Sequence, residues 1–212
     1  MSPFPRVNGV VYQGSIPSGL ETHYSYRDYR PLAHVLQKMN IPLHIYGNNN
    51  NFHQDYSYLG SCVYPTMPYV LLMQQLSRYD WGYCGAGVDS LETEVGGVKS
   101  DIFGVWDRVM PNKLFEYVAM GTPVIAGRGK EMGEWIKEYE VGIVIDKFDE
   151  IKKEYGWQEK YRKNCLKARG QFTMEKQVLM IERLYEKVSV RSTIIKNVRD
   201  AHRVPEKGTR KV

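Results

Sequence analysis

Short β-branched and aromatic runs alternate with longer helical segments along this chain, and this alternation constrains the fold more than any other feature. The first run, Val10-Val11-Tyr12, ends at a glycine turn, and the run Leu43–Tyr46 stops at Gly47. We predict strands at residues 10–12, 43–46, 62–65, 81–84, 122–126 and 141–145. We predict helices at residues 23–40, 69–79, 111–120, 131–140, 157–169 and 173–188. This order predicts an α/β fold, in which a parallel sheet is covered by helices on both faces.

Ligands of such sheets bind at the carboxyl ends of the strands. The residues to examine there are Gly14 with Ser15, Gly47, Tyr64, Gly85 and the segment before Pro111. That segment, residues 85–110, is rich in glycine and has no sustained period, so we predict a long loop. Neither a G-x-G-x-x-G motif after the first strand nor a P-loop is present, so the sequence supports neither nicotinamide binding nor a P-loop site.

Composition excludes several classes of protein. Hydrophobic residues make up 42% of the 212 residues, and no apolar run is long enough to span a bilayer. The three cysteines form no C-x-x-C pair, and the histidines have no ligand spacing, so we expect neither a disulfide framework nor a metal site. The N-terminus lacks the pattern of a secretory signal, which predicts the cytoplasm as the location.

The net charge of +5 resides entirely in residues 190–212, which hold seven Lys or Arg and two acidic residues. Because the remaining residues are neutral overall, we expect no nucleic-acid partner. We therefore divide the chain into a ligand-binding domain, residues 1–189, and a basic tail, residues 190–212. Apolar residues of the tail fall near one helix face, which is compatible with an anionic membrane surface. The alternative is a tail that docks on the domain and frays at its end.

The helix predicted to begin at Pro111 carries a group of polar residues on one face. Asn112, Lys113 and Glu116 are three and four positions apart, whereas Leu114 falls on the buried face. The helix N-terminus and Lys113 suit a diphosphate, and a carboxylate one turn later suits the two hydroxyls of a ribose. Spacing alone leaves another interpretation open, namely an ordinary solvated pair of Lys113 and Glu116.

The segment Pro111 to Ala126, PNKLFEYVAMGTPVIA, resembles the donor-site signature of nucleotide-sugar glycosyltransferases of the GT-B fold. The resemblance extends from about Val10 to Tyr185 and includes the segments Val11–Ser15, Ser77–Gly82 and Phe172–Glu175. It covers the C-terminal, donor-binding half of that fold, a Rossmann-like sheet. The N-terminal, acceptor-binding half has no counterpart in the sequence.

The resemblance implies that the chain is a glycosyltransferase component of the hexosyltransferase type, which binds a nucleotide-diphospho-sugar as substrate and needs no cofactor. It implies an acceptor-binding domain or subunit as partner, and it assigns no catalytic residue. Two alternatives remain open: an enzyme like the nucleotide-sugar epimerases, and a donor-binding module without turnover. The implied donor contacts are Gly14, Ser15, Pro111, Asn112, Lys113 and Leu114 for the diphosphate, Glu116 for the ribose, and Gly47 and Tyr64 for the base.

The sequence also departs from the family pattern. Many members carry a second glutamate eight positions before the one that matches Glu116, and this chain has Arg108 there, with Asp107 adjacent. The sugar and the catalytic competence of the chain are therefore open. Two other contacts have alternatives, since Gly14 and Ser15 suit an ordinary strand-to-helix turn and Tyr64 suits core packing.

Overall fold

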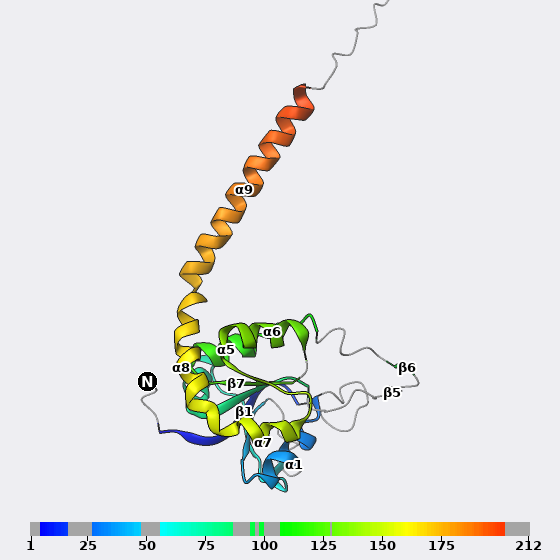
Figure 1. The fold of residues 1–212 in the computed structure, drawn as a ribbon, viewed down its shortest axis with the longest axis vertical. Coiled ribbons are helices and arrows are strands. Elements are labelled where there is room, and N and C mark those ends of the chain that lie inside the picture. Colours follow the sequence, from blue (N-terminus) through cyan, green and yellow to red (C-terminus); the bar gives the residue numbers. More distant parts are fainter. Residues whose placement is uncertain are drawn as a thin grey trace, which may run out of the picture. The chain divides into compact units, whose positions relative to one another are not determined.

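The computed structural model describes residues 5–16, 27–47, 56–86, 94–95, 98–99, 107–127 and 129–201. The chain forms two compact units, residues 1–169 and residues 170–212 (Figure 1). The first unit contains the sheet and the helices that surround it, and the second contains one helix.

A six-stranded sheet in the order β3-β2-β1-β4-β7-β8 forms the centre of the first unit, and all its pairings are parallel. The predicted fold class is therefore confirmed. The strands are β1 Val7–Gln13, β2 Leu43–Tyr46, β3 Cys62–Tyr64, β4 Tyr79–Cys84, β7 Val124–Ala126 and β8 Gly142–Val144. The pair β5 Glu94–Val95 and β6 Val98–Lys99 forms a separate antiparallel sheet inside the segment that we predicted as one long loop.

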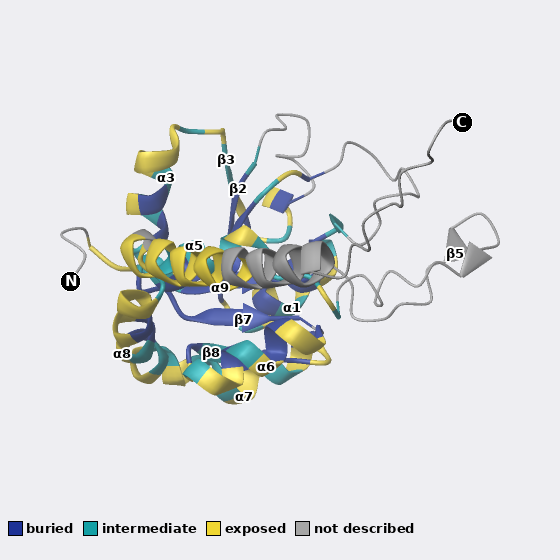
Figure 2. Cartoon of the chain, turned by 90° about the horizontal axis from the view of Figure 1, so that it is seen from above, coloured by how far each residue is buried: buried dark blue, intermediate teal, exposed yellow. Residues whose placement is uncertain are grey.

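Helices cover both faces of the sheet, with α5 and α6 on one side and α1 and α7 on the other (Figure 1). The central strands β1, β2, β4 and β7 are mostly buried, the edge strand β3 is partly exposed, and the outer faces of the helices are exposed (Figure 2). The helices are α1 Arg30–Lys38, α3 Tyr69–Leu76, α5 Asn112–Ala119, α6 Lys130–Tyr139, α7 Ile151–Glu154 and α8 Gln158–Ala168, with short 3₁₀ turns at Phe148–Glu150, Tyr155–Trp157 and Arg169–Gln171.

The main apolar core lies between the sheet and α1. Val10 and Tyr12 of β1 project to this side with Ile45 of β2, and they pack with Leu32 and Leu36 of α1. Alternate residues of a strand point to opposite faces, so Val11 and Gln13 project toward α5. This alternation decides which side chains reach the candidate site.

Helix α1 begins seven residues later than predicted. Residues 23–26 lie outside the described residues, and Arg27 to Tyr29 are not α-helical. Two side chains fix the start of the helix there. The Tyr56 hydroxyl accepts a hydrogen bond from the backbone amide of Tyr29. The Asp28 carboxylate accepts hydrogen bonds from the backbone amide and the guanidinium of Arg30. The correction therefore comes from a contact with a residue far along the chain.

The second unit contains α9, Met174–Ala201. This helix starts one residue after the start of the helix predicted at residues 173–188, and it continues through the first part of the predicted tail. Among the helices of the described ranges, none combines the length and the apolar character that crossing a membrane requires. The domain boundary at 189/190, the membrane association of the tail and the cytoplasmic location stay predictions.

A buried histidine links the first three strands near the amino end of β1. His44 is 5% exposed, its Nε2 lies 3.3 Å from the Asn8 carbonyl oxygen, and its Nδ1 lies 3.1 Å from the Tyr64 hydroxyl. Both contacts are satisfied when Nε2–H donates to Asn8 and Nδ1 accepts from Tyr64, which is the neutral ring. Burial lowers the pKa of His44, and the contact with Asn8 partly opposes this.

The lowered pKa predicts that the free energy of unfolding falls as the pH drops below about 6.5, the ordinary histidine value. Below that pH the unfolded chain binds a proton that folded His44 resists, at a cost of about 1.4 kcal/mol per pH unit until the folded pKa is reached. Urea unfolding at pH 7.0 and 5.5 measures the change. His44→Gln should reduce it, whereas the same substitution at exposed His34 is the matched control. An equal change in the two variants contradicts the assignment to His44.

Candidate functional site

The strand order reverses direction between β1 and β4, which are neighbours in the sheet although β2 and β3 lie between them in sequence. In open parallel sheets, a ligand crevice forms beyond the carboxyl ends of the two strands at such a reversal. Gly14 follows β1 there, and Gly85 follows β4. The candidate site is therefore at this edge of the sheet.

Gly14 leaves a bare stretch of backbone at the end of β1. Its φ of +143° is a conformation that glycine adopts and other residues rarely do. A Cβ at this position would lie 2.8 Å from the Tyr12 hydroxyl and 3.4 Å from Lys113 Nζ. Gly47 follows β2 alongside, where a Cβ would lie 2.9 Å from the Gly14 carbonyl oxygen. Two predicted site residues are thus adjacent, and both allow close approach to the backbone.

Tyr117 fixes helix α5 against this edge. Its ring rests on Gly82 of β4, where a Cβ would lie 2.5 to 2.7 Å from three ring atoms. Its hydroxyl accepts a hydrogen bond from the backbone amide of Gln13 at 3.1 Å and donates one to the Val11 carbonyl oxygen at 3.3 Å. Because Tyr117 is fully buried, these contacts set the position of the whole helix.

Lys113, one turn before Tyr117, extends over the end of β1. Its Nζ lies 4.1 Å from the centre of the Tyr12 ring, a cation–π contact that the missing Cβ of Gly14 leaves room for. No acidic side chain within the described ranges forms an ion pair with Lys113. A half-buried cation that no described acidic residue neutralises favours an anion at this place.

The N-terminus of α5 adds two backbone donors. Pro111 is the N-cap with an extended backbone, so the helix starts one residue later than predicted. The Leu114 amide donates to the Pro111 carbonyl oxygen at 3.0 Å, while the amides of Asn112 and Lys113 have no acceptor among the described residues. Asn112 is exposed, whereas the Leu114 side chain is completely buried. Of these predicted contacts, Leu114 can offer a ligand only its backbone.

Glu116 lies beside Lys113 on the same helix face and interacts with two residues that the sequence did not single out. The Gln13 side-chain amide donates to Glu116 Oε2. The Tyr69 hydroxyl interacts with the same carboxylate, and the pKa of Tyr69 is raised by desolvation first and by Glu116 second. Gln13 ends the first strand and Tyr69 begins the helix after Tyr64, and their contact with Glu116 requires the folded sheet.

The remaining predicted residues are less central. Tyr64 stacks on Tyr46 with a centroid distance of 4.7 Å, and its hydroxyl faces His44. Burial, with contributions from Cys62 and Tyr46, raises the pKa of Tyr64 to about 12. This packing agrees with the alternative interpretation, in which Tyr64 packs in the core. Contact of Tyr64 with a base stays a prediction. Ser15 is exposed next to Gly14.

The comparisons with known proteins bear on the whole domain. A family model described as Glucosyltransferase 3-like, C-terminal domain, matches residues 25–164. The chain belongs to this family. Comparison with curated protein sequences gives no match.

Three solved structures show that this Glucosyltransferase 3-like domain has the fold of the C-terminal half of GT-B glycosyltransferases. Sucrose-phosphate synthase from Thermosynechococcus elongatus matches with a TM-score of 0.58 and 16% identity, over 88% of this chain and 47% of that one. The GtfA/B complex matches with 0.59 and 11%, over 88% and 37%. The glycosyltransferase AviGT4, involved in avilamycin A biosynthesis, matches with 0.55 and 12%, over 84% and 51%. The chain therefore spans about half the length of these proteins, or less.

Asp107 has a structural contact in this Glucosyltransferase 3-like domain. Its Oδ1 accepts the Lys130 amide at 3.2 Å, and its carbonyl oxygen accepts the Glu131 amide at 3.0 Å, so it caps the start of α6. Arg108 is exposed, and it stands at the position where many GT-B glycosyltransferases carry a glutamate. Asp107 therefore has a structural role at the start of α6.

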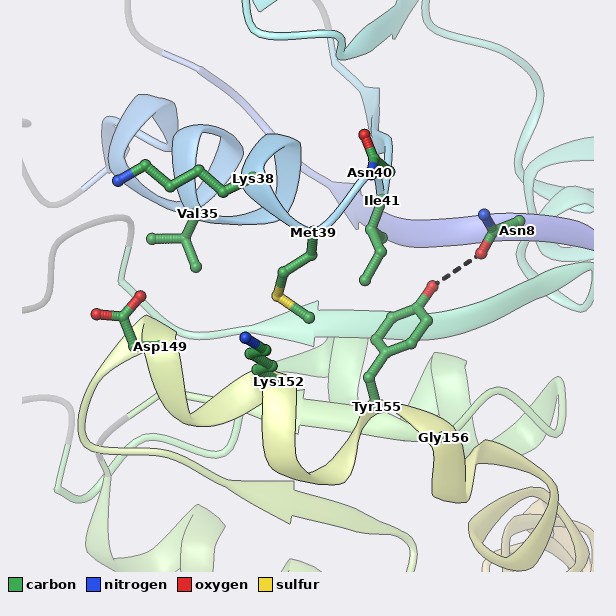
Figure 3. A pocket seen from close by; sticks show the side chains of 10 residues that line it. All are labelled: Asn8, Val35, Lys38, Met39, Asn40, Ile41, Asp149, Lys152, Tyr155 and Gly156. Carbon is green, nitrogen blue, oxygen red and sulfur yellow. Dashed lines mark hydrogen bonds between the residues drawn. The ribbon is translucent and has the colours of Figure 1, made fainter.

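Metal binding and other cavities can be surveyed for the described part of the chain. No group of three or more His, Cys, Asp or Glu side chains within it could hold a metal ion. A surface cavity of about 770 Å³ lies between α1 and α7, near the amino ends of the strands (Figure 3). Asn8, Lys38, Asp149, Lys152 and Tyr155 line it together with apolar residues, and none of the predicted site residues does.

Proposed function

We propose that this domain binds the nucleotide-diphospho-sugar donor of a glycosyltransferase. The observation that supports this most is the convergence of Lys113, Glu116 and two α5 amides at the strand reversal, beside the bare backbone of Gly14. These two amides have no acceptor in the part of the chain that the structure describes. A cation and backbone donors suit a diphosphate, and an adjacent carboxylate suits a ribose.

The residues of this edge can assist glycosyl transfer by stabilising the leaving group. Cleavage of the bond between sugar and diphosphate leaves negative charge on the phosphate oxygens. Lys113 and the amides at the start of α5 are fixed before the reaction, so they can bind this charge without reorganisation. Gly14 allows the phosphates to approach the backbone, while the Glu116 carboxylate accepts the hydroxyls of the ribose.

The acceptor site is proposed to come from another domain or subunit. One similar structure is that of the GtfA/B complex, of which this chain covers 37% in length. A second candidate function is donor binding without turnover, favoured by Asp107 capping α6 and by Arg108 in place of a glutamate. Sugar transfer assayed with and without the acceptor-binding partner distinguishes the two.

Titration calorimetry with UDP, GDP and their sugars tests donor binding directly. We expect saturable binding of one nucleoside diphosphate by the folded chain. A folded chain that gives no saturable heat with any of these ligands contradicts the proposal.

Two substitutions should separate the roles of Lys113 and Glu116. Lys113→Ala should weaken binding of the nucleoside diphosphate and leave binding of the bare nucleoside unchanged. Only the diphosphate carries the negative charge that Lys113 Nζ binds. Glu116→Gln should weaken both ligands by about 1–3 kcal/mol, because a charge-assisted contact with the ribose is lost. Calorimetry with each ligand measures the pattern, and circular dichroism checks the fold. Equal losses for both ligands with Lys113→Ala indicate damage to the helix instead.

A further inference from the structure

The Glu116 carboxylate accepts a hydrogen bond from Gln13 and interacts electrostatically with Tyr69, residues of two different elements. Gln13 ends β1 and is only 6% exposed, and its side-chain amide donates to Glu116 Oε2. Tyr69 begins α3 and is 60% exposed, and its hydroxyl interacts with the same carboxylate. One contact is therefore made from the interior and the other from the rim of the site.

Gln13 is itself rigid, which makes its contact with Glu116 specific in direction. Its backbone N–H donates a hydrogen bond to the hydroxyl of Tyr117, the residue directly after Glu116. Strand β1 pairs Gln13 with Tyr46 of β2, so the backbone is fixed on that side as well. The fixed backbone and the burial of the side chain together restrict the direction from which Gln13 reaches the carboxylate of Glu116.

The geometry leaves part of the carboxylate free for a ligand. A carboxylate offers about four lone-pair positions on its two oxygens, and Gln13 and Tyr69 together use at most two of them. The remaining positions are available to a ligand, and Glu116 lies one turn after Lys113 on α5. Two vicinal hydroxyls fit such a fixed acceptor, because both can donate to it at once.

We propose that Gln13 and Tyr69 are positioning residues that orient Glu116 toward the two hydroxyls of a ribose, and so give the site its selectivity for ribonucleotides over 2′-deoxyribonucleotides. This inference rests on the proposed function. A ribose donates two hydroxyl groups to the fixed carboxylate, and a 2′-deoxyribose donates one. Without Gln13 or Tyr69 the carboxylate rotates, and the second hydroxyl loses its defined acceptor.

The test compares the dissociation constants of a ribonucleoside diphosphate and its 2′-deoxy form, with UDP and 2′-deoxy-UDP or the guanosine pair. We expect the wild-type chain to prefer the ribonucleotide by about tenfold or more, the ratio that one charge-assisted hydrogen bond supplies. Tyr69→Phe and Gln13→Leu should each move this ratio toward one. Tyr58→Phe is the matched control, because Tyr58 is 84% exposed and lies in a turn outside α3, and it should keep the wild-type ratio.

A double-mutant cycle separates positioning from a structural role. In a Glu116→Gln background, Tyr69→Phe and Gln13→Leu should not change the ratio further, because the acceptor that they orient is already altered. The double variant Gln13→Glu/Glu116→Gln retains a hydrogen bond between the two positions and moves the charge, so it should remain folded and lose the preference. Tyr69→Phe changes only an exposed hydroxyl and provides the test even if Gln13→Leu is unstable.

The possible failures can be told apart. If the folded wild-type chain binds neither nucleoside diphosphate, the proposed function fails. If it binds them but does not discriminate ribose from deoxyribose, or if Tyr69→Phe and the folded Gln13→Leu variant keep the wild-type ratio, the positioning role is wrong and the donor site stands.

Discussion

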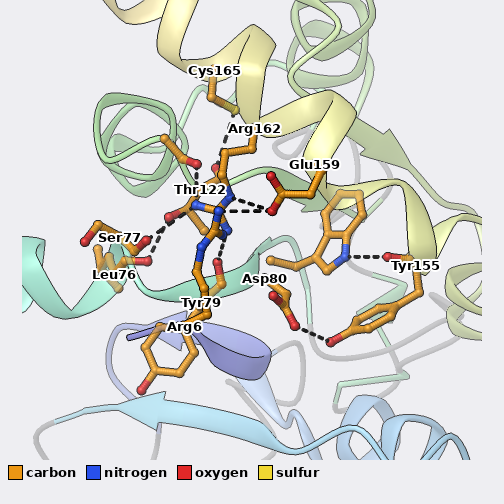
Figure 4. A network of polar contacts seen from close by, with 12 residues as sticks. Arg6, Leu76, Ser77, Tyr79, Asp80, Thr122, Tyr155, Glu159, Arg162 and Cys165 are labelled. Atoms are coloured by element: carbon orange, nitrogen blue, oxygen red, sulfur yellow. Dashed lines mark hydrogen bonds and ion pairs between the residues drawn. The ribbon is translucent and has the colours of Figure 1, made fainter. Parts of the chain in front are cut away.

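Arg162→Leu is expected to lower the free energy of unfolding by about 3–5 kcal/mol, because it removes a buried, charged donor that bonds to three backbone carbonyl groups. Arg162 is 6% exposed, and its guanidinium donates to the carbonyl oxygens of Gly121 at 2.7 Å and Tyr79 at 2.5 Å (Figure 4). A third carbonyl oxygen, that of Ser77, lies at 3.4 Å. The side chain thus joins α8 to the end of α5 and the start of β4.

The ion pair of this network is weaker than its hydrogen bonds. Arg162 Nε lies 3.7 Å from Glu159 Oε1, and Glu159 also pairs with Arg6 at 3.0 Å. Burial lowers the pKa of Arg162 to about 10, with Arg6 acting in the same direction and Glu159 against it. The side chain therefore remains charged at neutral pH, and its loss removes charged donors.

Urea unfolding of the two variants Arg162→Leu and Arg169→Leu measures this effect. Arg169 is exposed and makes one contact, 3.5 Å to the Ala119 carbonyl oxygen, so its substitution is the matched control and should change the unfolding free energy by less than about 0.5 kcal/mol. Because Arg162 lies at the amino edge of the sheet, the folded fraction of Arg162→Leu should still bind nucleotide. Equal stability of the two variants contradicts the role of Arg162.

The sequence predicted the sheet because its strands carry local signals. Val124–Ala126 and Leu43–Tyr46 are short, apolar and followed by glycine, so periodicity and turn residues suffice. The start of β1 at Val7 could not be predicted, since Val7 joins the sheet through a bond to the Arg78 carbonyl oxygen. Likewise, Arg162 has no local signal, because its helix is rich in lysine and its burial depends on carbonyls 41 to 85 residues away.

The residues of the candidate site also fall into two groups: those that local spacing predicts and those that only the folded sheet brings together. Asn112, Lys113 and Glu116 belong to one helix turn, so their shared face could be predicted from spacing. Gln13 lies 103 residues from Glu116, and only the pairing of β1 with the sheet and the packing of α5 bring the two together. The one local hint was a polar residue at the end of an apolar strand. Leu114 was assigned to the donor site by resemblance, yet its side chain contributes to the core.

Gly82→Ala is expected to impair both stability and nucleotide binding. Its Cβ would lie 2.5 to 2.7 Å from the Tyr117 ring, which is fully buried and cannot swing away. Overpacking of this kind costs about 1–3 kcal/mol. The ring can give way only if α5 moves, and Lys113 and Glu116 move with it. Binding of a nucleoside diphosphate should therefore weaken at least tenfold, which is about the loss of affinity that results when one hydrogen bond is broken.

Urea unfolding and calorimetry on the same samples distinguish this coupling from simple destabilisation. Gly156→Ala is the matched control, because a Cβ there has no atom within 4 Å, and it should change neither quantity. Tyr117→Phe keeps the ring and removes the acceptor of the Gln13 amide, so it should weaken binding without overpacking. If folded Gly82→Ala binds nucleotide as tightly as the wild type, the position of α5 does not control the site. If both variants weaken binding, the contact of Tyr117 with β1 and β4 determines where Lys113 and Glu116 lie.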